Sequence, residues 1–387
     1  MDSNVEAVPE QGAEVVIAEA PPEITPTEVK IVLSEQQAKA LEEVKQWFAD
    51  STRKEFRLGG AAGTGKTTLI KQIVQELNVP TEVVSFTGKA VAVLRKKGLW
   101  QARTLHDLLY TFRFDGTRYI ATPREYLFDC KLVIVDEASM VSTSLFNDLT
   151  RHDVKILWVG DPFQLEPVGE NPEVLKRLDC LLTEIHRQAK LSPILRLATA
   201  VRGGMTEIPV GKWEREQSSL NVVRYLTELE DTYDVVVCGK NATRHRVNAL
   251  RRKERNYDDI LHEGETVVCL QNAKDMGVFN GMTFKVQKVH KSMLVRTNCI
   301  YTDLVDDTGR EYPDVPIRTD FFGKDFKRDF QKEAIPFDYG YALTAHKCQG
   351  SEFDSVLVID EPLYGSETNR WRYTAITRAA KHLTYVL

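Results

Sequence analysis

Residues 58–70, LGGAAGTGKTTLI, constrain this chain more than any other stretch. They match the pattern G-x-x-x-x-G-K-[ST] from Gly60 to Thr67, between an apolar strand-like run and a helical pattern. Glycines at this spacing let backbone N–H groups converge on phosphate oxygens, and the N-terminus of the following helix adds positive potential. We therefore expect a nucleoside triphosphate site in an α/β fold, and not a glycine-rich turn with a chance lysine.

Apolar runs alternate with helical patterns along the rest of the chain. A capping box formed by Ser34 and Gln37 predicts a helix over 34–49. Strands are predicted at 55–60, 81–87, 131–139, 154–161 and 233–241. Continuous apolar strands that alternate with helices are typical of parallel sheets covered on both faces. Short strands between 263 and 302, the third of them over 292–300, predict a small β-barrel insert before the α/β pattern resumes at 339.

The charge of the chain is unevenly distributed. The formal net charge is −5, but residues 1–29 contain no Lys or Arg and seven acids, Asp2, Glu6, Glu10, Glu14, Glu19, Glu23 and Glu28. The remainder carries 51 basic and 49 acidic residues, so a basic groove on a nearly neutral body is compatible with a nucleic-acid partner. We interpret 1–29 as a disordered acidic tail that either solvates the protein or docks a partner.

Neither a membrane nor an oxidising compartment is indicated. The sequence has no apolar run of 18 residues and no basic segment followed by an apolar one at its start. The cysteines, Cys130, Cys180, Cys238, Cys269, Cys299 and Cys348, form no C-x-x-C pair, so neither zinc nor a disulfide framework is expected. A reducing cytoplasm fits best.

A second nucleotide motif follows the predicted strand at 131–139, LVIVDEAS. Asp136 and Glu137 come at the carboxyl end of this buried strand, where ligands bind in open α/β sheets. We expect Lys66 to reach the β- and γ-phosphates, Thr67 and Asp136 to hold Mg²⁺, and Glu137 to act as the general base for an attacking water. Adjacent acids favour hydrolysis, although such a pair alone also ends many inert strands.

Further motifs, in one order, resemble the superfamily 1 helicases of class B, the RecD-like group, and the phage Dda helicases in particular. LSEQQ (33–37) is similar to the adenine-reading Q motif, FTGKAVAVL (86–94) to motif Ia and TLHDLL (104–109) to motif Ib. VGDPFQLEPV (159–168) resembles motif III, LTEIHRQ (182–188) motif IV, the stretch 337–358 motif V and YTAITRA (373–379) motif VI. The resemblance covers residues 33 to 387.

This resemblance implies a motor in which two RecA-like domains bind ATP and Mg²⁺ between them. The expected nucleotide contacts are Gln37, Gly60, Gly63, Thr64, Gly65, Lys66, Thr67, Thr68, Asp136 and Gly350. The expected catalytic residues are Lys66, Glu137, Gln164, Arg187 and Arg378. Gln164 follows a strand parallel to that of Asp136, so we expect it near the γ-phosphate, the alternative being an ordinary turn glutamine. Arg187 and Arg378 would stabilise the transferred phosphoryl group when the cleft closes, or else serve as interdomain ion pairs.

The track would be a single strand of DNA held through its phosphates and by stacking on aromatic side chains. The candidate contacts are Thr87, Lys89, Thr104, His106, Phe112, Phe114, Asn241, Thr344, His346 and Lys347. The helix at 242–253 adds basic residues, which are equally explained as a solvated face, and His346 is also explained as a buried histidine. The resemblance further implies a monomer that acts at a DNA fork in a bacterial or phage-infected cytoplasm. The expected protein partner is a single-strand-binding, replication or recombination protein.

The stretch YTFRFDGTRYIA (110–121) predicts a β-hairpin with a two-residue turn at Asp115 and Gly116. In the family a pin that splits the duplex lies here, so Phe112, Phe114 and Tyr119 either face the first base pair or pack on the domain. Residues 303–336 are shorter than the tower that braces the pin in Dda proteins. The predicted function is an ATP-dependent 5′–3′ DNA helicase, with the polarity given by resemblance alone. The alternative is a translocase that remodels bound proteins; a metabolite kinase is disfavoured by the paired arginines and the second domain.

The predicted fold class is α/β, with two RecA-like parallel-sheet P-loop domains, a β-hairpin insert in the first and a small SH3-like β-barrel insert in the second. The expected boundaries are 1–29 for the tail, 30–190 for the first domain with its hairpin at about 108–128, 191–258 and 337–387 for the second, and 259–336 for the insert.

Overall fold

The computed structural model describes most of the chain from residue 32 onward. The described ranges are 32–114, 119–127, 129–166, 174–185, 191–215, 218–226, 232–258, 260–271, 273, 276, 278, 280–290, 298–306, 309–325, 334–362 and 367–387, with only the backbone course for 112–114 and 119–121. Residues 33–387 form one compact unit. The predicted acidic tail, the turn at Asp115 and Gly116, and Arg187 lie outside the described residues.

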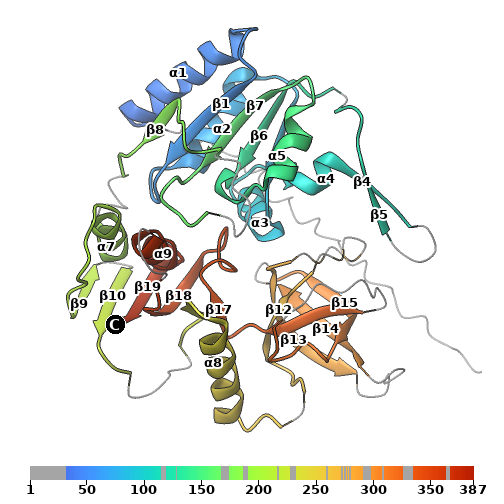
Figure 1. Ribbon diagram of the computed structural model, residues 1–387, viewed down its shortest axis with the longest axis vertical. Coiled ribbons are helices and arrows are strands. Elements are labelled where there is room, and N and C mark those ends of the chain that lie inside the picture. Colours follow the sequence, from blue (N-terminus) through green and yellow to red (C-terminus); the bar gives the residue numbers. More distant parts are fainter. Residues whose placement is uncertain are drawn as a thin grey trace, which may run out of the picture. The chain divides into compact units, whose positions relative to one another are not determined.

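The first sheet carries the glycine-rich loop and is parallel throughout, in the order β3-β2-β6-β7-β1-β8 (Figure 1). Its strands are β1 (Glu55–Gly60), β2 (Thr81–Ser85), β3 (Arg103–Thr104), β6 (Leu132–Asp136), β7 (Lys155–Gly160) and β8 (Cys180–Leu182). The strand β7 pairs with both β1 and β6, so it lies between them. The carboxyl ends of β1, β7 and β6 are therefore neighbours at one edge of the sheet.

Helices cover both faces of this sheet, as predicted. They are α1 (Glu35–Ala49), α2 (Lys66–Leu77), α3 (Gly88–Lys96), α4 (Leu105–Leu109), the 3-10 turn η1 (Ala138–Met140) and α5 (Thr143–Thr150). Ile134 and Leu157 pack into one apolar cluster with α1 and α2. Val133 and Trp158 pack into another with α4 and α5, because successive strand residues point to opposite faces. The capping box that begins α1 at Ser34 is confirmed.

The predicted hairpin is confirmed as β4 (Tyr110–Phe114) and β5 (Tyr119–Pro123), which pair antiparallel with Phe114 opposite Tyr119. At its base, the Tyr110 hydroxyl donates a hydrogen bond to the Asp148 carboxylate of α5. Burial, followed by this carboxylate, raises the pKa of Tyr110 to about 12. The side chains of Phe112, Phe114 and Tyr119 lie outside the described residues.

The second sheet has the order β17-β11-β18-β19-β10-β9 and is parallel except for its edge strand β9. Its strands are β9 (Gly211–Arg215), β10 (Ser218–Val223), β11 (Val235–Cys238), β17 (Ala342–Thr344), β18 (Phe353–Ile359) and β19 (Ala379–Val386). Its helices are α7 (Pro193–Arg202), α8 (Asn241–Glu254) and α9 (Glu367–Ile376). Trp371 and Tyr373 of α9 belong to the apolar cluster that covers this sheet.

The predicted barrel is closed, and two of its strands, β15 and β16, follow the short strands predicted between 263 and 302. It consists of β12 (Thr266–Cys269), β13 (Thr283–His290), β14 (Cys299–Asp306), β15 (Glu311–Arg318) and β16 (Ile335–Tyr339). The strand predicted at 292–300 falls mostly outside the described residues, and the expected boundary at 336 cuts β16. The strand β15 contains Pro313 and Pro316, and prolines are unfavourable inside a strand because they cannot donate a backbone hydrogen bond. Near these prolines the pairing register between β14 and β15 shifts.

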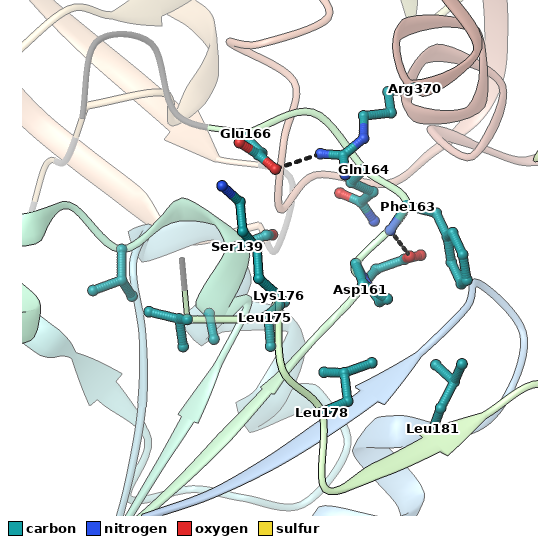
Figure 2. A pocket seen from close by; sticks show the side chains of 14 residues that line it. Ser139, Asp161, Phe163, Gln164, Glu166, Leu175, Lys176, Leu178, Leu181 and Arg370 are labelled. Atoms are coloured by element: carbon teal, nitrogen blue, oxygen red, sulfur yellow. Dashed lines mark hydrogen bonds and ion pairs between the residues drawn. The ribbon is translucent and has the colours of Figure 1, made fainter. Parts of the chain in front are cut away.

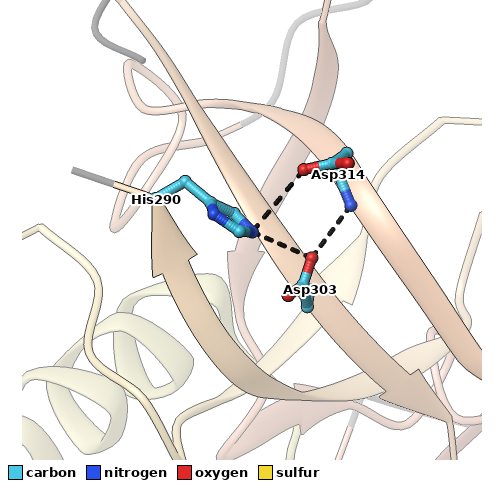
Figure 3. A group of neighbouring side chains, drawn as sticks. All are labelled: His290, Asp303 and Asp314. Atoms are coloured by element: carbon cyan, nitrogen blue, oxygen red, sulfur yellow. Dashed lines mark hydrogen bonds and ion pairs between the residues drawn. The ribbon is translucent and has the colours of Figure 1, made fainter. Parts of the chain in front are cut away.

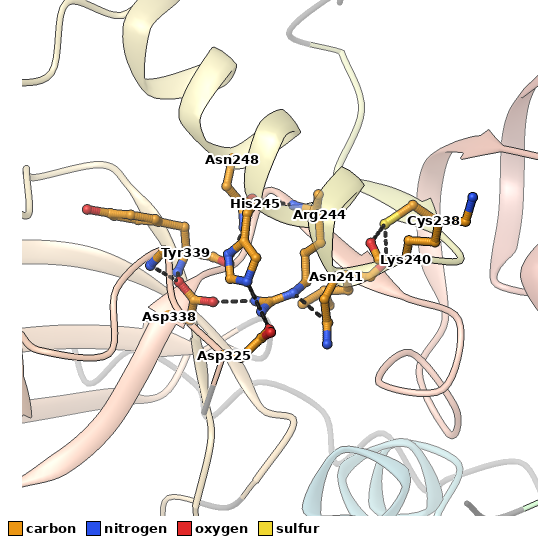
Figure 4. A network of polar contacts seen from close by, with 12 residues as sticks. Cys238, Lys240, Asn241, Arg244, His245, Asn248, Asp325, Asp338 and Tyr339 are labelled. Carbon is orange, nitrogen blue, oxygen red and sulfur yellow. Dashed lines mark hydrogen bonds and ion pairs between the residues drawn. The ribbon is translucent and has the colours of Figure 1, made fainter. Parts of the chain in front are cut away.

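A buried polar network joins α8 to the barrel strand β16 (Figure 4). Arg244 of α8 forms an ion pair with Asp338, and their side chains are 1% and 0% exposed. The same carboxylate accepts the backbone N–H groups of Gly323 and Tyr339, both at 2.8 Å. Asn248 donates to the Tyr339 carbonyl at 3.1 Å. A buried carboxylate without such donors would be strongly destabilising, so these contacts fix α8 on β16.

We expect Arg244→Met to lower the free energy of unfolding by about 3–5 kcal/mol, because it leaves the Asp338 charge buried without its cationic partner. The measurement is urea unfolding followed by circular dichroism. The matched control is Lys381→Met, which removes the exposed 2.7 Å pair with Asp354 and should cost less than about 1 kcal/mol. Equal losses in the two variants would contradict the prediction.

Candidate functional site

The glycine-rich loop joins the carboxyl end of β1 to the first turn of α2, as the sequence predicts. Gly63 and Gly65 have φ angles of 78° and 76°, in the left-handed region that favours glycine. A Cβ atom on Gly60 would lie 2.9 Å from the Lys66 side chain, so the backbone and this lysine approach closely. The Lys66 ammonium donates to the carbonyls of Gly60, at 2.8 Å, and Ala61, at 3.3 Å. The lysine therefore lies directly over the loop that would hold the phosphates.

Gln37 braces this loop from α1. Its side chain is 1% exposed, accepts the Ser34 N–H at 3.0 Å and donates to the Thr64 carbonyl at 3.0 Å. Thr64 in turn donates its hydroxyl to the Ala61 carbonyl at 2.8 Å. Thr67 and Thr68 follow Lys66 in the first turn of α2. The expected adenine contact of Gln37 stays a prediction, since the described contacts of this side chain go to the loop and to its own helix cap.

Asp136 and Glu137 end β6 beside the loop. Burial, followed by the charge of Glu137, raises the pKa of Asp136, whereas Lys66 opposes the rise. Glu137 has a φ of 54°, an unfavourable backbone conformation for this residue type. Its Oε2 atom is buried and has no hydrogen-bond partner in the described part of the chain. Two close carboxylates, one with an orphaned buried oxygen, beside the Lys66 charge form a donor set that fits Mg²⁺ and a water molecule.

The turn after β7 brings a third group of polar residues between these two. Asp161 is fully buried, and its carboxylate accepts the Phe163 N–H at 3.0 Å and the Tyr373 hydroxyl at 2.7 Å. Gln164 is 5% exposed, and its amide oxygen has no partner among the described residues. β7 pairs in parallel with β6, so the two turns lie at one edge of the sheet, as predicted for Gln164. Its contact with a γ-phosphate stays a prediction.

A cavity of about 460 Å³ opens beside Gln164 (Figure 2). Its walls include Ser139 after β6, the apolar side chains Leu175 and Leu178, and an ion pair of 2.7 Å between Arg370 of α9 and Glu166. The Ser139 hydroxyl is also buried without a partner among the described residues. The cavity therefore adjoins the predicted nucleotide site and is closed on one side by a helix of the second sheet.

Arg378 makes its hydrogen bonds within the second sheet. Its side chain is 4% exposed and donates to the carbonyls of Thr374, Cys348 and Ser351 at 2.9, 3.3 and 2.9 Å. A fourth bond goes to the Thr377 hydroxyl at 3.1 Å. The guanidinium thus binds the last turn of α9 and the connection between β17 and β18, so its predicted role at the phosphate requires it to leave these oxygens.

Gly350 lies against the start of α3. It has a φ of 70°, and a Cβ atom there would be 3.0 Å from the Thr87 hydroxyl. The connection between β17 and β18 therefore packs closely on the N-terminus of α3, and the expected nucleotide contact of Gly350 stays a prediction.

The predicted track residues of the first sheet lie at helix starts. Thr87 and Thr104 are the N-caps of α3 and α4. Lys89 is buried, with its ammonium 3.8 Å from the centre of the Phe353 ring and 3.4 Å from the Thr283 hydroxyl. His106 stacks on Tyr110 at the base of the hairpin. These side chains follow β2 and β3, which are neighbours, so the structure brings them to one edge.

The predicted track residues of the second sheet follow β11 and β17, also neighbours. Thr344 ends β17, and burial lowers the pKa of both His346 and Lys347, with the nearby Arg244 charge as the next cause for Lys347. Asn241 opens α8, and its amide oxygen accepts from Arg244 at 3.3 Å. The Glu361 carboxylate lies at the start of α8, where it accepts hydrogen bonds from the backbone N–H groups of Gly239 and Lys240, both at 3.2 Å. A phosphate would have to compete with this carboxylate there.

The basic helix α8 is not a uniform charged face. Arg244 and Arg251 are buried, and Arg252 pairs with the buried Glu265 at 2.9 Å. Arg246 and Lys253 are exposed. The solvated-face explanation therefore fits Arg246 and Lys253, whereas Arg244 and Arg252 serve packing.

A separate group of possible metal ligands lies on the barrel (Figure 3). His290 Nε2 is 2.9 Å from an Asp303 oxygen and 3.6 Å from an Asp314 oxygen. The Asp314 backbone N–H, followed by His290, lowers the pKa of Asp303. The three residues come from the paired strands β13, β14 and β15, so cross-strand ion pairing accounts for their proximity.

Sequence reasoning missed the residues of α9 that contact the first sheet. The Tyr373 hydroxyl accepts the Ala62 N–H at 2.8 Å, and the Thr374 hydroxyl accepts the Leu165 N–H at 2.9 Å. Gln349 donates to the Leu165 carbonyl at 2.6 Å. Both residues of α9 lie in the stretch singled out for Arg378, but their partners are about 200 or more positions away. Nothing in the local pattern identifies such partners.

Two family descriptions match this chain. Residues 32–224 match the AAA domain family, and residues 339–386 match the UvrD-like helicase C-terminal domain. The first match contains the glycine-rich loop, both strand-end motifs and α7, and the second contains β17 and α9.

Two of the similar proteins are DNA helicases by name. The ATP-dependent RecD2 DNA helicase of Deinococcus radiodurans is 27% identical over 388 residues, which cover 92% of this chain and 49% of that protein. The ATP-dependent DNA helicase dda of Enterobacteria phage T4 is 31% identical over 166 residues, which cover 38% of this chain and 37% of that protein. The chain thus spans about half, or less, of these curated relatives.

A solved structure of Pif1 helicases at forked double-stranded DNA has the same fold. It matches with a TM-score of 0.59 and 19% identity over 92% of both chains. The chain therefore has the Pif1 helicase fold, a parallel-sheet RecA-like core with a closed barrel. No helix among the described residues is long and apolar enough to cross a membrane.

We expect Asp136→Asn to stabilise the nucleotide-free protein at pH 8, by up to about 4 kcal/mol. The raised pKa means that the folded state disfavours the charged carboxylate, so the destabilisation is absent below pH 3.8, grows between pH 3.8 and about 7, and is constant above that. Urea unfolding at pH 8 and pH 5 measures the difference, which should be smaller at pH 5.

The control is Asp153→Asn. Lys54 lowers the pKa of Asp153, so this substitution removes a favourable charge and should not stabilise at either pH. A loss of stability in Asp136→Asn at pH 8 would show that the charged Asp136 is favourable in the folded state.

Proposed function

This chain is related to the superfamily 1B, RecD-like helicases and to Dda, and we propose that it hydrolyses ATP to move along single-stranded DNA and unwind duplex DNA in the 5′–3′ direction. The proposal rests on one observation: the carboxyl ends of β1, β7 and β6 are adjacent. The glycine-rich loop, Asp161 and the pair Asp136–Glu137 lie at adjacent ends of β1, β7 and β6, and α9 of the second sheet hydrogen-bonds to this group.

In the proposed reaction Lys66 leaves the carbonyls of Gly60 and Ala61 for the β- and γ-phosphates. Thr67 and Asp136 would hold Mg²⁺, which supplies charge neutralisation for the phosphates. Glu137 takes a proton from the attacking water, since its Oε2 atom is buried without a partner among the described residues. Gln164 accepts a hydrogen bond from the same water through its unpaired amide oxygen, or donates to the γ-phosphate through its amide nitrogen.

The arginines would link hydrolysis to motion. For Arg378 to reach the γ-phosphate, it must leave the carbonyls of Cys348 and Ser351, which lie in the connection between β17 and β18. That connection also carries Gly350 and the proposed track residues His346 and Lys347. An arginine that exchanges these carbonyls for phosphate would therefore shift the loop that holds the strand. Arg187 would act with it from the first domain.

The proposed track runs over the carboxyl ends of β2 and β3 and then of β11 and β17, where its phosphates meet Thr87, Thr104, Asn241 and Thr344. The hairpin of β4 and β5 would act as the pin at a fork, with Phe112 and Phe114 toward the first base pair. We further propose that the two sheets are separate RecA-like domains, that the barrel is SH3-like, and that the protein acts as a cytoplasmic monomer with a single-strand-binding, replication or recombination protein.

The general base is tested by Glu137→Gln, which keeps the shape of the side chain and removes its basicity. We expect ATP and oligothymidylate binding to be retained while DNA-stimulated turnover falls at least about 10²-fold. Lys66→Ala serves as the contrast, because it should weaken nucleotide binding as well as turnover. Steady-state ATP hydrolysis and a fluorescent-nucleotide titration measure the two effects. Near-normal hydrolysis in Glu137→Gln would remove Glu137 from this role.

Strand separation is tested with the double variant Phe112→Ala plus Phe114→Ala on duplexes that carry either a 5′ or a 3′ single-stranded tail. The wild type should unwind the 5′-tailed duplex. The variant should keep DNA-stimulated hydrolysis and lose unwinding, because stacking on a base contributes about 1–3 kcal/mol, comparable to opening a pair. Equal loss of both activities would assign these residues to the core. Unchanged unwinding would favour the remodelling translocase, and unwinding from 3′ tails would reverse the proposed polarity.

A further inference from the structure

One hydroxyl connects the phosphate loop to the second sheet. Tyr373 lies on α9, is 2% exposed, and packs edge-on against Phe163 with the ring centres 6.4 Å apart. Its oxygen accepts the Ala62 N–H of the glycine-rich loop at 2.8 Å and donates to Asp161 at 2.7 Å. The hydroxyl thus joins the ends of β1 and β7 from the opposite sheet.

Each partner of this hydroxyl depends on it. Asp161 is fully buried, and apart from Tyr373 its carboxylate accepts the Phe163 N–H at 3.0 Å. The Ala62 N–H belongs to the loop whose N–H groups are arranged for phosphate oxygens. Burial, followed by the Asp161 charge, raises the pKa of Tyr373, so the hydroxyl stays protonated and remains a donor at physiological pH. A buried hydrogen bond to a charged group is among the stronger ones in proteins.

We propose that Tyr373 is a positioning residue that couples the nucleotide state of the loop to the position of the second sheet. Any change in the loop at Ala62 moves the N–H donor that binds the Tyr373 hydroxyl of α9, and Asp161 transmits the same change to the turn that carries Gln164. The neighbouring Thr374–Leu165 bond supports the same contact without touching the loop. This inference rests on the proposed ATP-driven function, and it assigns to Tyr373 the mechanical link between hydrolysis and the strand.

The chain provides a matched control in Tyr385. This tyrosine is also fully buried in the second sheet, and its hydroxyl donates to Asp360 at 2.7 Å, the same distance as in the Tyr373–Asp161 bond. Asp360 is held by Arg372 within the same sheet, so the Tyr385 bond does not reach the loop. Tyr373→Phe and Tyr385→Phe therefore each remove one buried hydroxyl next to a carboxylate, and only the first removes a link between the sheets.

We expect Tyr373→Phe to lower the kcat of DNA-stimulated ATP hydrolysis about tenfold or more while the KM for ATP stays unchanged. Without nucleotide, the variant should bind a labelled oligothymidylate as tightly as the wild type. In the wild type this affinity should change when ADP–aluminium fluoride is added, and in the variant it should not. Asp161→Asn, which keeps the size of the acceptor, should give the same pattern. Tyr385→Phe should match the wild type in all of these measurements.

Hydrogen exchange of α9 with and without ADP–aluminium fluoride provides a readout that does not depend on DNA. The wild type should show a nucleotide-dependent change in α9, and Tyr373→Phe should not. Wild-type behaviour of Tyr373→Phe, or equal losses in both tyrosine variants, would overturn the proposal. If the wild type lacks DNA-stimulated hydrolysis, the proposed function fails, and the exchange comparison still decides whether Tyr373 couples nucleotide to α9.

Discussion

The Asp161 carboxylate is buried without access to water, so protein donors must stabilise it. One donor is the local Phe163 N–H, and the other is the Tyr373 hydroxyl from the second sheet. This requirement places α9 directly over the ends of β1 and β7, where the glycine-rich loop begins. The contact between the two sheets at this point is therefore made by the same atoms that border the phosphate loop.

The two attachments of the second sheet differ in kind. Towards the barrel, the buried ion pair of Arg244 and Asp338 carries additional backbone donors, which makes it costly to open. Towards the first sheet, Tyr373 makes one bond to the Asp161 carboxylate, and the other bonds near the loop, those of Tyr373 with Ala62 and of Thr374 and Gln349 with Leu165, are neutral, with the ion pair of Arg370 and Glu166 partly exposed. Neutral bonds of this kind contribute about 1 kcal/mol each. The attachment of the second sheet to the barrel is therefore costlier to open than any single neutral bond at the loop.

Several groups assigned to the phosphates are bound to carbonyl oxygens of the protein. Lys66 lies on Gly60 and Ala61, and Arg378 lies on Cys348 and Ser351. Carbonyl oxygens are weaker partners for a cation than phosphate oxygens, so each group can exchange one for the other at low cost. Glu137 differs, since its strained backbone and unpaired buried oxygen are already present. The proposed base is therefore preorganised, whereas Lys66 and Arg378 would first have to leave these carbonyl oxygens to reach a phosphate.

Local residue patterns determined the glycine-rich loop, the capping box of α1, the acids after β6 and the hairpin strands, because each depends on neighbours within a few positions. The barrel was only partly predictable, since the prolines of β15 conceal a strand that its partners complete. Only the tertiary structure decided that β7 enters the sheet between β1 and β6 and that Tyr373 reaches Ala62 and Asp161. Strand order and contacts across hundreds of positions arise from the packing of whole faces, and no local period in the sequence encodes them.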